Sequence, residues 1–277
     1  MKPLSFVNGE YRTATRKASW LASRCPSFAF YSRMAWIVWR AGLKASRGPY
    51  DDQDWVNSSL EVVRALERVG VEFEVTGIEH LEQLESPCLI VGNHMSTLET
   101  CVLPGLVQPR RDVTFVVKQS LLDYPVFKHV MRSRDPIAVS QTDPRADFKA
   151  MMQGGQERLA KGISLIVFPE GERGAKFNPD AFNTIGVKLA RKASVPIIPL
   201  ALDTSAWRIG KWITDMGTID PSHKVRFAFG EPISVQGRGT EEQEQIVNFI
   251  VKNLSGWNGC HEMSPDAAGH NAAEFPS

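Results

Sequence analysis

The chain has 277 residues, of which 43% are hydrophobic and 23% charged, so it can bury the core of one large domain and is not disordered throughout. Its net charge of +1 hides an asymmetry, because residues 1–50 carry a net charge of +8 and the remainder −7. The four cysteines lack the paired spacing of a zinc site and are too few for a disulfide scaffold, which favours a reducing cytosolic setting.

Residues 1–50 form a basic segment in which the aromatic-rich residues 20–43 predict a helix that lies on a lipid surface. On a helical wheel its apolar side is flanked by Arg33 and Arg40, with Trp36 and Trp39 beyond them. This pattern suits rings at the depth of lipid headgroups and arginines that reach phosphates. The predicted membrane-interface residues are Arg24, Arg33, Trp36, Trp39 and Arg40.

Two other interpretations of this helix stay open. It could pack into the core with both arginines at its rim, or it could cross the bilayer as one tilted span. The second is disfavoured because Arg33 and Arg40 would lie inside the membrane. No stretch of 18 residues is free of charge, and the first ten residues lack the hydrophobic core of a signal peptide. The sequence thus gives no clear sign of export or of a membrane span.

From residue 51 to residue 255, apolar strands alternate with helices. The predicted strands are 71–75, 88–91, 113–117, 163–168, 195–202 and 225–229. The predicted helices are 55–69, 99–107, 144–161, 183–193 and one from the N-cap Thr240 to Leu254. This alternation predicts an α/β domain with a mainly parallel central sheet and helices on both faces. Residues 256–277 lack periodicity and are expected to form a disordered tail.

The most informative stretch follows the apolar strand 88–91. Gly92 ends this strand, and His94 comes next at the sheet edge where open α/β sheets carry their sites. Glu99 lies about 140° around a helix from His94, so the two meet only if His94 precedes the helix. Ser96 and Glu99 form a capping-box pattern that starts the helix there. The alternative is that Glu99 only caps the helix and that His94 only makes hydrogen bonds within its loop.

A histidine held by a carboxylate can take a proton from an attacking hydroxyl. Ser96 is near in sequence, but no Gly-x-Ser-x-Gly motif supports a nucleophilic serine. A metal site built on His94 and Glu99 lacks further placed ligands. Lys118, Arg173 and Lys176, with backbone amides at Gly171, could receive a phosphate. Each of these cations could equally be a solvated surface charge.

Four ordered blocks carry a family resemblance over roughly residues 72–232. They are Asn93-His94-x-Ser96-x-x-Glu99, Lys118 with Pro125, Phe168-Pro-Glu-Gly-x-Arg173 and Val195-Pro-Ile-Ile-Pro199. Their order resembles that of the 1-acylglycerol-3-phosphate acyltransferases, the lysophospholipid acyltransferase family. An N-terminal hydrophobic helical region at the membrane is also usual in that family.

The resemblance implies that His94 is the catalytic base, that Glu99 is its catalytic partner, and that no acyl-enzyme, metal or other cofactor is needed. The acceptor's hydroxyl would attack the thioester of acyl-CoA or acyl carrier protein directly. The implied partners are this donor, a lysophospholipid acceptor and the cytoplasmic face of the inner membrane, with no nucleic acid. The expected substrate-binding residues are Asn93, Ser96, Lys118, Glu170, Gly171, Arg173 and Lys176.

Three positions depart from the family pattern. Glu99 replaces the usual aspartate, Glu172 replaces a threonine, and Gln141 stands where an arginine usually ends the second block. Arg134, Arg145 or Lys176 could replace that charge. Otherwise the acceptor could be a lysolipid other than 1-acylglycerol-3-phosphate. The remaining alternatives are a thioesterase or lysophospholipase, and a lipid-binding protein without catalysis.

Overall fold

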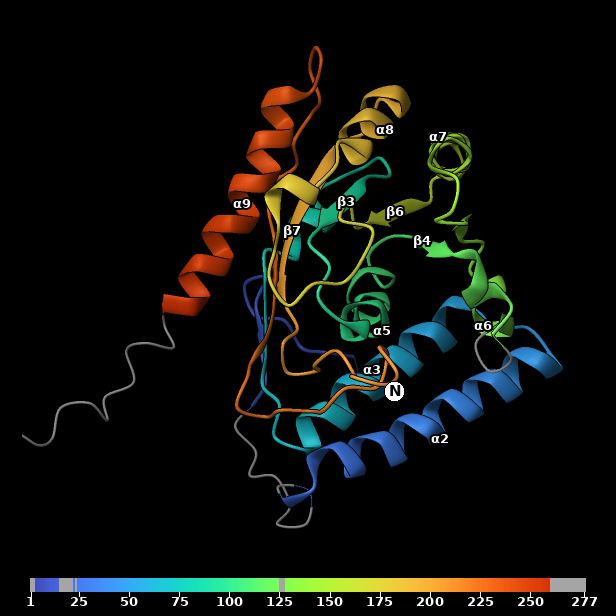
Figure 1. The fold of residues 1–277 in the computed structure, drawn as a ribbon, viewed down its shortest axis with the longest axis vertical. Helices are drawn as coiled ribbons and strands as arrows, with labels where there is room; N and C mark the ends of the chain where they lie inside the picture. Colours follow the sequence, from blue (N-terminus) through green and yellow to red (C-terminus); the bar gives the residue numbers. More distant parts are fainter. Residues whose placement is uncertain (1–2, 15–21, 23, 125–127, 260–277) are drawn as a thin grey trace, which may run out of the picture.

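An eight-stranded sheet forms the centre of the computed structural model, which describes residues 3–14, 22, 24–124 and 128–259 (Figure 1). The strand order is β1-β2-β8-β7-β3-β6-β4-β5. The strands are β1 (Tyr11–Arg12), β2 (Phe73–Thr76), β3 (Leu89–Gly92), β4 (Val113–Lys118), β5 (Ile137–Val139), β6 (Ser164–Val167), β7 (Ile197–Asp203) and β8 (Val225–Phe229).

The expected mainly parallel sheet is confirmed. All neighbouring strands are parallel except the pairs β1–β2 and β7–β8. Strand β8 is inserted between β2 and β7, parallel to the first and antiparallel to the second. The sequence did not predict β1 or β5, because strands of two and three residues are too short to show a hydrophobic period.

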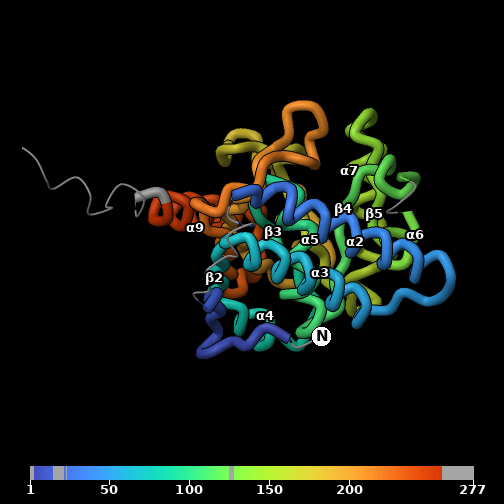
Figure 2. The backbone as a smooth tube through the Cα atoms, turned by 90° about the horizontal axis from the view of Figure 1, so that it is seen from below, coloured from blue at the N-terminus to red at the C-terminus, as the bar shows by residue number. Residues whose placement is uncertain are grey.

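Helices cover both faces of the sheet (Figures 1 and 2). Residues Cys88 and Ile90 of the β3 segment face the cluster under the helices α2 (Pro26–Arg47), α3 (Asp52–Arg68) and α5 (Thr97–Val107). Leu89 and Val91 face the opposite cluster, under α7 (Pro144–Ala160), α8 (Ile185–Ala193) and α9 (Thr240–Gly259). Because both faces are buried, this strand is a continuous apolar run. Shorter helical segments are α4 (Glu79–Glu82), η1 (Gln119–Leu122), α6 (Lys128–Arg132) and η2 (Pro179–Ala181).

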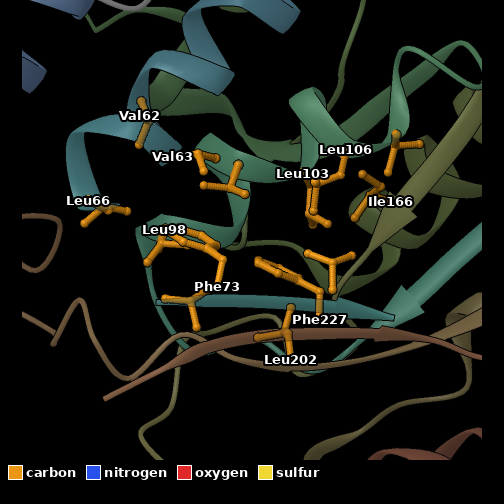
Figure 3. Close-up of a cluster of buried hydrophobic side chains, with 14 of the residues drawn as sticks. Val62, Val63, Leu66, Phe73, Leu98, Leu103, Leu106, Ile166, Leu202 and Phe227 are labelled. Carbon is orange, nitrogen blue, oxygen red and sulfur yellow. The ribbon is translucent and has the colours of Figure 1, made fainter. Parts of the chain in front are cut away.

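The larger core joins α3 and α5 to the strands. Figure 3 shows Val63 and Leu66 of α3 and Leu103 of α5 turned toward Phe73 and Phe227 on the sheet. Helices α3 and α5 approach each other at Gly105, where an added Cβ would lie 2.7 Å from the Ser59 hydroxyl oxygen. This packing holds α5 against α3, and the capping box lies at the opposite, N-terminal end of α5.

The described part of the N-terminal segment packs against the same core. Strand β1 pairs with β2, and Phe30 and Ile37 of α2 are buried in the larger cluster. Arg33 and Arg40 lie beside Glu61 of α3, which is 7% exposed, so these two of the three predicted interface arginines neutralise a buried carboxylate. The core-packing interpretation therefore accounts for one side of α2.

The other side of α2 is apolar and exposed. Phe28, Trp36 and Trp39 are 78%, 49% and 53% exposed, and the two indole rings lie 5.0 Å apart. Arg24 is also exposed. No helix within the described residues is long and apolar enough to cross a bilayer.

Boundaries elsewhere follow the sequence closely, with one difference at the end. Asp143 caps α7 with Pro144 in its first turn, as expected. Helix α9 runs to Gly259, beyond the predicted end at Leu254, so residues 256–259 are helical. The rest of the predicted tail, residues 260–277, and Pro125 of the second block lie outside the described residues.

Candidate active site

The site lies where three neighbouring strands end. Strands β7, β3 and β6 are adjacent and parallel, so their carboxyl ends meet at one edge of the sheet. His94 follows β3, the segment from Phe168 to Arg173 follows β6, and Thr204 follows β7. The sequence predicted the first two groups and missed Thr204, although the same rule about strand ends applies to it.

His94 and Glu99 are in direct contact, as the sequence predicted. The Nδ1 of His94 lies 2.9 Å from Oε1 of Glu99, and the two side chains are 16% and 0% exposed. Ser96 is the N-cap of α5, and Glu99 completes the capping box. Because a carboxylate only accepts hydrogen bonds, Nδ1 carries the proton, and Nε2 is left as the basic nitrogen.

Glu99 accepts hydrogen bonds on both oxygens. The amides of Met95 and Ser96 donate to Oε1 at 2.6 and 2.8 Å, and the hydroxyls of Ser96 and Thr204 donate to Oε2 at 3.0 and 2.8 Å. Burial by itself would raise the pKa of Glu99, but these bonds and His94 outweigh it and hold the pKa below its usual value. The carboxylate is therefore a fixed negative charge behind the imidazole.

The chain after β6 holds the other side of His94. The ring of Phe168 stacks on the imidazole at 4.4 Å with the planes 5° apart. Glu170 Oε1 accepts the backbone N–H of His94 at 2.8 Å, and burial raises the pKa of this carboxyl. The ring plane and the backbone of His94 are both fixed before any substrate binds. The sequence did not mark Phe168 as part of the site.

Several predicted substrate-binding residues are instead used inside the protein. Asn93 is fully buried, and its side-chain amide exchanges two 2.9 Å hydrogen bonds with the backbone of Leu202 on β7. Ser96 is 3% exposed and bonded to Glu99 and Thr204, which also removes it as a nucleophile. The sequence did not predict these internal contacts, because a strand-end position does not show which way a side chain turns.

Two further residues that were predicted to bind substrate hold loops in place. The carboxylate of Glu170 accepts the amides of His94 and, at 3.4 Å, Asn178. The N–H of Gly171, expected to bind a phosphate, donates to the carbonyl of Phe168 at 3.1 Å, and the positive φ of 76° at Gly171 closes this turn. In this arrangement the N–H of Gly171 is already used, and the Glu170 carboxylate holds two backbone amides in place.

Arg173 remains the best placed cation. Its NH1 bonds the hydroxyl of Thr97, next to the capping serine, and lies 2.5 Å from Asp215 Oδ1. Lys118 and Lys176 are both exposed. Among the described residues, no hydrogen bond or ion pair joins either lysine to the His94 cluster.

Two of the three positions that depart from the family pattern, Gln141 and Glu172, lie beside Gly171. Gln141 donates from its side chain to the carbonyl of Gly171 at 3.1 Å, so it ties β5 to the turn after β6. Arg134 is bonded to Asp52 and to the carbonyl of Tyr50, so it does not replace the absent arginine. Arg145 lies exposed in the first turn of α7, and Glu172 is exposed.

Known proteins share both the sequence and the fold. An acyltransferase family model matches residues 72–203. A 1-acyl-sn-glycerol-3-phosphate acyltransferase of Pseudomonas aeruginosa is 30% identical over 188 residues, which cover 68% of each chain. A Mycoplasma pneumoniae protein named "Probable 1-acyl-sn-glycerol-3-phosphate acyltransferase" is 27% identical over 192 residues, 67% of this chain and 71% of that one.

The crystal structure of the 1-acyl-sn-glycerophosphate acyltransferase PlsC from Thermotoga maritima has a similar fold. The TM-score is 0.58 at 20% sequence identity, over 84% of this chain and 94% of that chain. At 20% identity this structural similarity supports the fold alone, whereas the Pseudomonas protein supports a relationship in sequence. The shared fold and the 30% identity over two thirds of both chains show that this protein belongs to the 1-acylglycerol-3-phosphate acyltransferase family.

Proposed function

We propose that this acyltransferase moves a fatty acyl group from acyl-CoA or acyl carrier protein to the free hydroxyl of 1-acylglycerol-3-phosphate, in phospholipid synthesis. The observation that carries the proposal is the His94–Glu99 contact. It fixes a basic nitrogen at a sheet edge, and Ser96, two residues after His94, is committed to the cap of α5. Such a site activates an external hydroxyl and forms no acyl-enzyme.

The reaction then follows from proton positions. Nε2 of His94 takes the proton of the acceptor hydroxyl while its oxygen attacks the thioester carbonyl. The tetrahedral intermediate collapses, the carbon–sulfur bond breaks, and the imidazolium returns the proton to the leaving thiolate. Glu99 stabilises the imidazolium through Nδ1, and Phe168 lies against its face.

Arg173 is the proposed contact for the acceptor's phosphate. Its guanidinium can bind a phosphate with two parallel hydrogen bonds, and it reaches the site through Thr97 beside the N-terminus of α5. Exposed Lys118, Arg145 and Lys176 would add a diffuse positive field. The acceptor's headgroup and the choice of thioester carrier are both parts of this proposal.

Thiol release from palmitoyl-CoA tests the function. The assay is run in detergent, with and without a panel of lysolipids, and compares the wild type with His94→Ala. We expect release that requires lysophosphatidic acid and falls by about 10²- to 10⁴-fold in the variant, the usual contribution of a positioned base. His129→Ala changes an exposed histidine on α6 and serves as the matched control.

The alternatives give different results in the same assay. Release without any acceptor would replace the proposal with a thioesterase or lysophospholipase. Release that requires another lysolipid would change the acceptor. If neither acyl-CoA nor acyl carrier protein donors react while the protein still binds liposomes, it is a lipid-binding protein.

We further propose that the protein is peripheral on the cytoplasmic face of the inner membrane. The exposed aromatic side of α2 supports this, with Arg24 near its start. Deleting α2 would expose the core around Phe30, so point changes are the better test. Trp36→Ala with Trp39→Ala is expected to weaken sedimentation with phosphatidylglycerol vesicles, and Val251→Ala on the exposed side of α9 is not.

A further inference from the structure

The loop from Arg208 to Gly217, between β7 and β8, presents apolar side chains to solvent. Trp212 is 98% exposed, Ile213 57% and Met216 53%. Single exposed apolar residues are common, but three within five residues of one loop form a cluster that needs a partner. In Figure 2 this orange loop stands at the edge of the molecule, beside the yellow segment that follows β6.

The loop has a fixed base. The Arg208 amide donates to Thr218 and the Gly210 amide to Thr214, which closes the loop on itself. Tyr31 of α2 donates its hydroxyl hydrogen to the carbonyl of Gly217 at 2.6 Å. The apolar tip is therefore held outward on a hydrogen-bonded frame that is attached to α2, the helix with the exposed tryptophans.

The same loop reaches the active site through Asp215. Its Oδ1 lies 2.5 Å from NH1 of Arg173 and accepts the hydroxyl of Thr97 at 3.0 Å. Arg173 also bonds Thr97, so the three side chains form a closed triangle. Every hydrogen bond of the Arg173 side chain to a described residue uses NH1. Nε and NH2, the other edge of the guanidinium, can still face an anion.

We propose that the loop Arg208–Gly217 docks on the lipid surface and that Asp215 positions Arg173 for the acceptor's phosphate. This inference rests on the proposed function, because it assumes a phosphate-bearing lysolipid as acceptor. The acyl chain of such an acceptor stays in the bilayer, so the edge of the active site that carries Arg173 must approach the headgroups. An apolar loop at this edge is exposed in solution and is buried in the lipid surface when the enzyme reaches its substrate.

The chemistry of the loop fits an anionic bilayer interface. Trp212 is suited to headgroup depth, and exposed Lys211 precedes it. Asp215, the loop's sole acidic residue, is turned to Arg173, which leaves the tip without a free negative charge. A lipid surface accordingly attracts the tip by both apolar burial and charge.

Asp215 orients Arg173 and does not compete with the acceptor. A competing carboxylate would occupy the guanidinium edge that binds phosphate with two bonds, whereas Asp215 uses NH1, which Thr97 also uses. With an amide in place of the carboxylate, the arginine keeps only neutral partners, the Thr97 hydroxyl and the amide oxygen, and its side chain regains rotamers. Acceptor binding should weaken while the proton transfer at His94 proceeds unchanged.

The test uses two variants and two presentations of the acceptor. Asp215→Asn and Trp212→Ala are assayed with long-chain lysophosphatidic acid in phosphatidylglycerol vesicles and with a short-chain, monomeric analogue in solution. Asp135→Asn, which removes another half-exposed partner of an arginine, is the control for the ion pair. Val251→Ala on α9 is the control for the exposed side chain. Asp215→Glu keeps the carboxylate.

We expect Asp215→Asn to raise the KM for the acceptor by about fivefold in both presentations, the effect of an exposed ion pair worth about 1 kcal/mol. The kcat should stay within about twofold, and Asp215→Glu should restore most of the KM. Trp212→Ala should weaken vesicle binding by about tenfold and raise the KM only with vesicles. Both controls should behave as the wild type.

Opposite results would overturn the inference. A lower KM in Asp215→Asn would mean that Asp215 competes with the phosphate, and an unchanged KM would mean that it has no role. Unchanged vesicle binding in Trp212→Ala would remove the lipid surface as the loop's partner. If the wild type shows no transfer to lysophosphatidic acid, the proposed function fails instead, and vesicle binding of Trp212→Ala still decides the docking surface separately.

Discussion

Replacing Glu99 by glutamine isolates the charge behind the catalytic histidine. The amide has nearly the shape of the carboxylate, and its oxygen can still accept from His94, Met95 and Ser96. Its NH2 group would face the hydroxyls of Ser96 and Thr204, which can rotate and accept. The hydrogen-bond network therefore survives, and the variant is expected to fold.

The loss in rate follows from the geometry. In the transition state His94 becomes an imidazolium whose Nδ1 lies 2.9 Å from Glu99 Oε1. Taking about 4 Å between the charge centres and an effective dielectric constant of about 20, the attraction is about 4 kcal/mol. Losing it corresponds to a fall of about 10³-fold in kcat. The KM for the acceptor should change little, because no acceptor contact is removed.

The assay is steady-state thiol release with saturating acyl-CoA and lysophosphatidic acid, beside thermal unfolding of each variant. Glu61→Gln is the matched control, since it neutralises another buried glutamate, on α3 and paired with Arg40. It should lower stability and leave kcat unchanged. If Glu99→Gln folds and keeps more than about a tenth of the wild-type kcat, Glu99 serves only as a helix cap and the reasoning fails.

Four further outcomes are expected. Phe168→Ala should lower kcat by up to about tenfold without unfolding the protein, because stacking on the imidazolium is worth about 1 kcal/mol; circular dichroism beside the thiol assay checks this. Thr204→Val should cost about tenfold in kcat, because Glu99 loses one hydrogen bond at a buried oxygen. Asn93→Ala should lower the free energy of unfolding by about 2–4 kcal/mol in a urea titration, since two buried backbone groups lose partners. Glu99 has a lowered pKa in the folded protein, so its contribution to stability is complete above the unfolded pKa and is lost as the pH falls through the folded pKa. The difference in stability between the wild type and Glu99→Gln should therefore shrink on acidification below about pH 4.5. A difference that grew instead would refute the direction of the pKa shift.

The local features of this fold could be read from the chain. The apolar run before Gly92 and the capping box at Ser96 placed His94 and Glu99 in contact, because both features depend on neighbouring residues only. The insertion of β8 beside β2 and its antiparallel pairing with β7 could not be predicted, because the sequence of a five-residue strand does not show which strands it pairs with.

The contacts in the site that the sequence did not predict have the same origin. Asn93 was expected to bind substrate, but its direction depends on β7, whose Leu202 lies 109 positions further along the chain. Thr204 lies 105 positions from Glu99, and Asp215 lies 118 positions from Thr97. The pairing of Arg33 on α2 with Glu61 on α3 depends on how the two helices pack. A helical wheel of α2 alone does not show this packing.

Glu99 itself shows why a change from the usual aspartate is compatible with the reaction. Capping boxes prefer Glu or Gln at the third helical position, where the side chain reaches back to the N-cap amide. Here the carboxylate is placed by the amides of Met95 and Ser96 before it meets His94. The longer side chain therefore lets one residue both start α5 and orient the base. Since Thr204, just after the end of β7, binds the second oxygen, the extra methylene does not leave the carboxylate loose, and the catalytic charge is fixed by the fold alone.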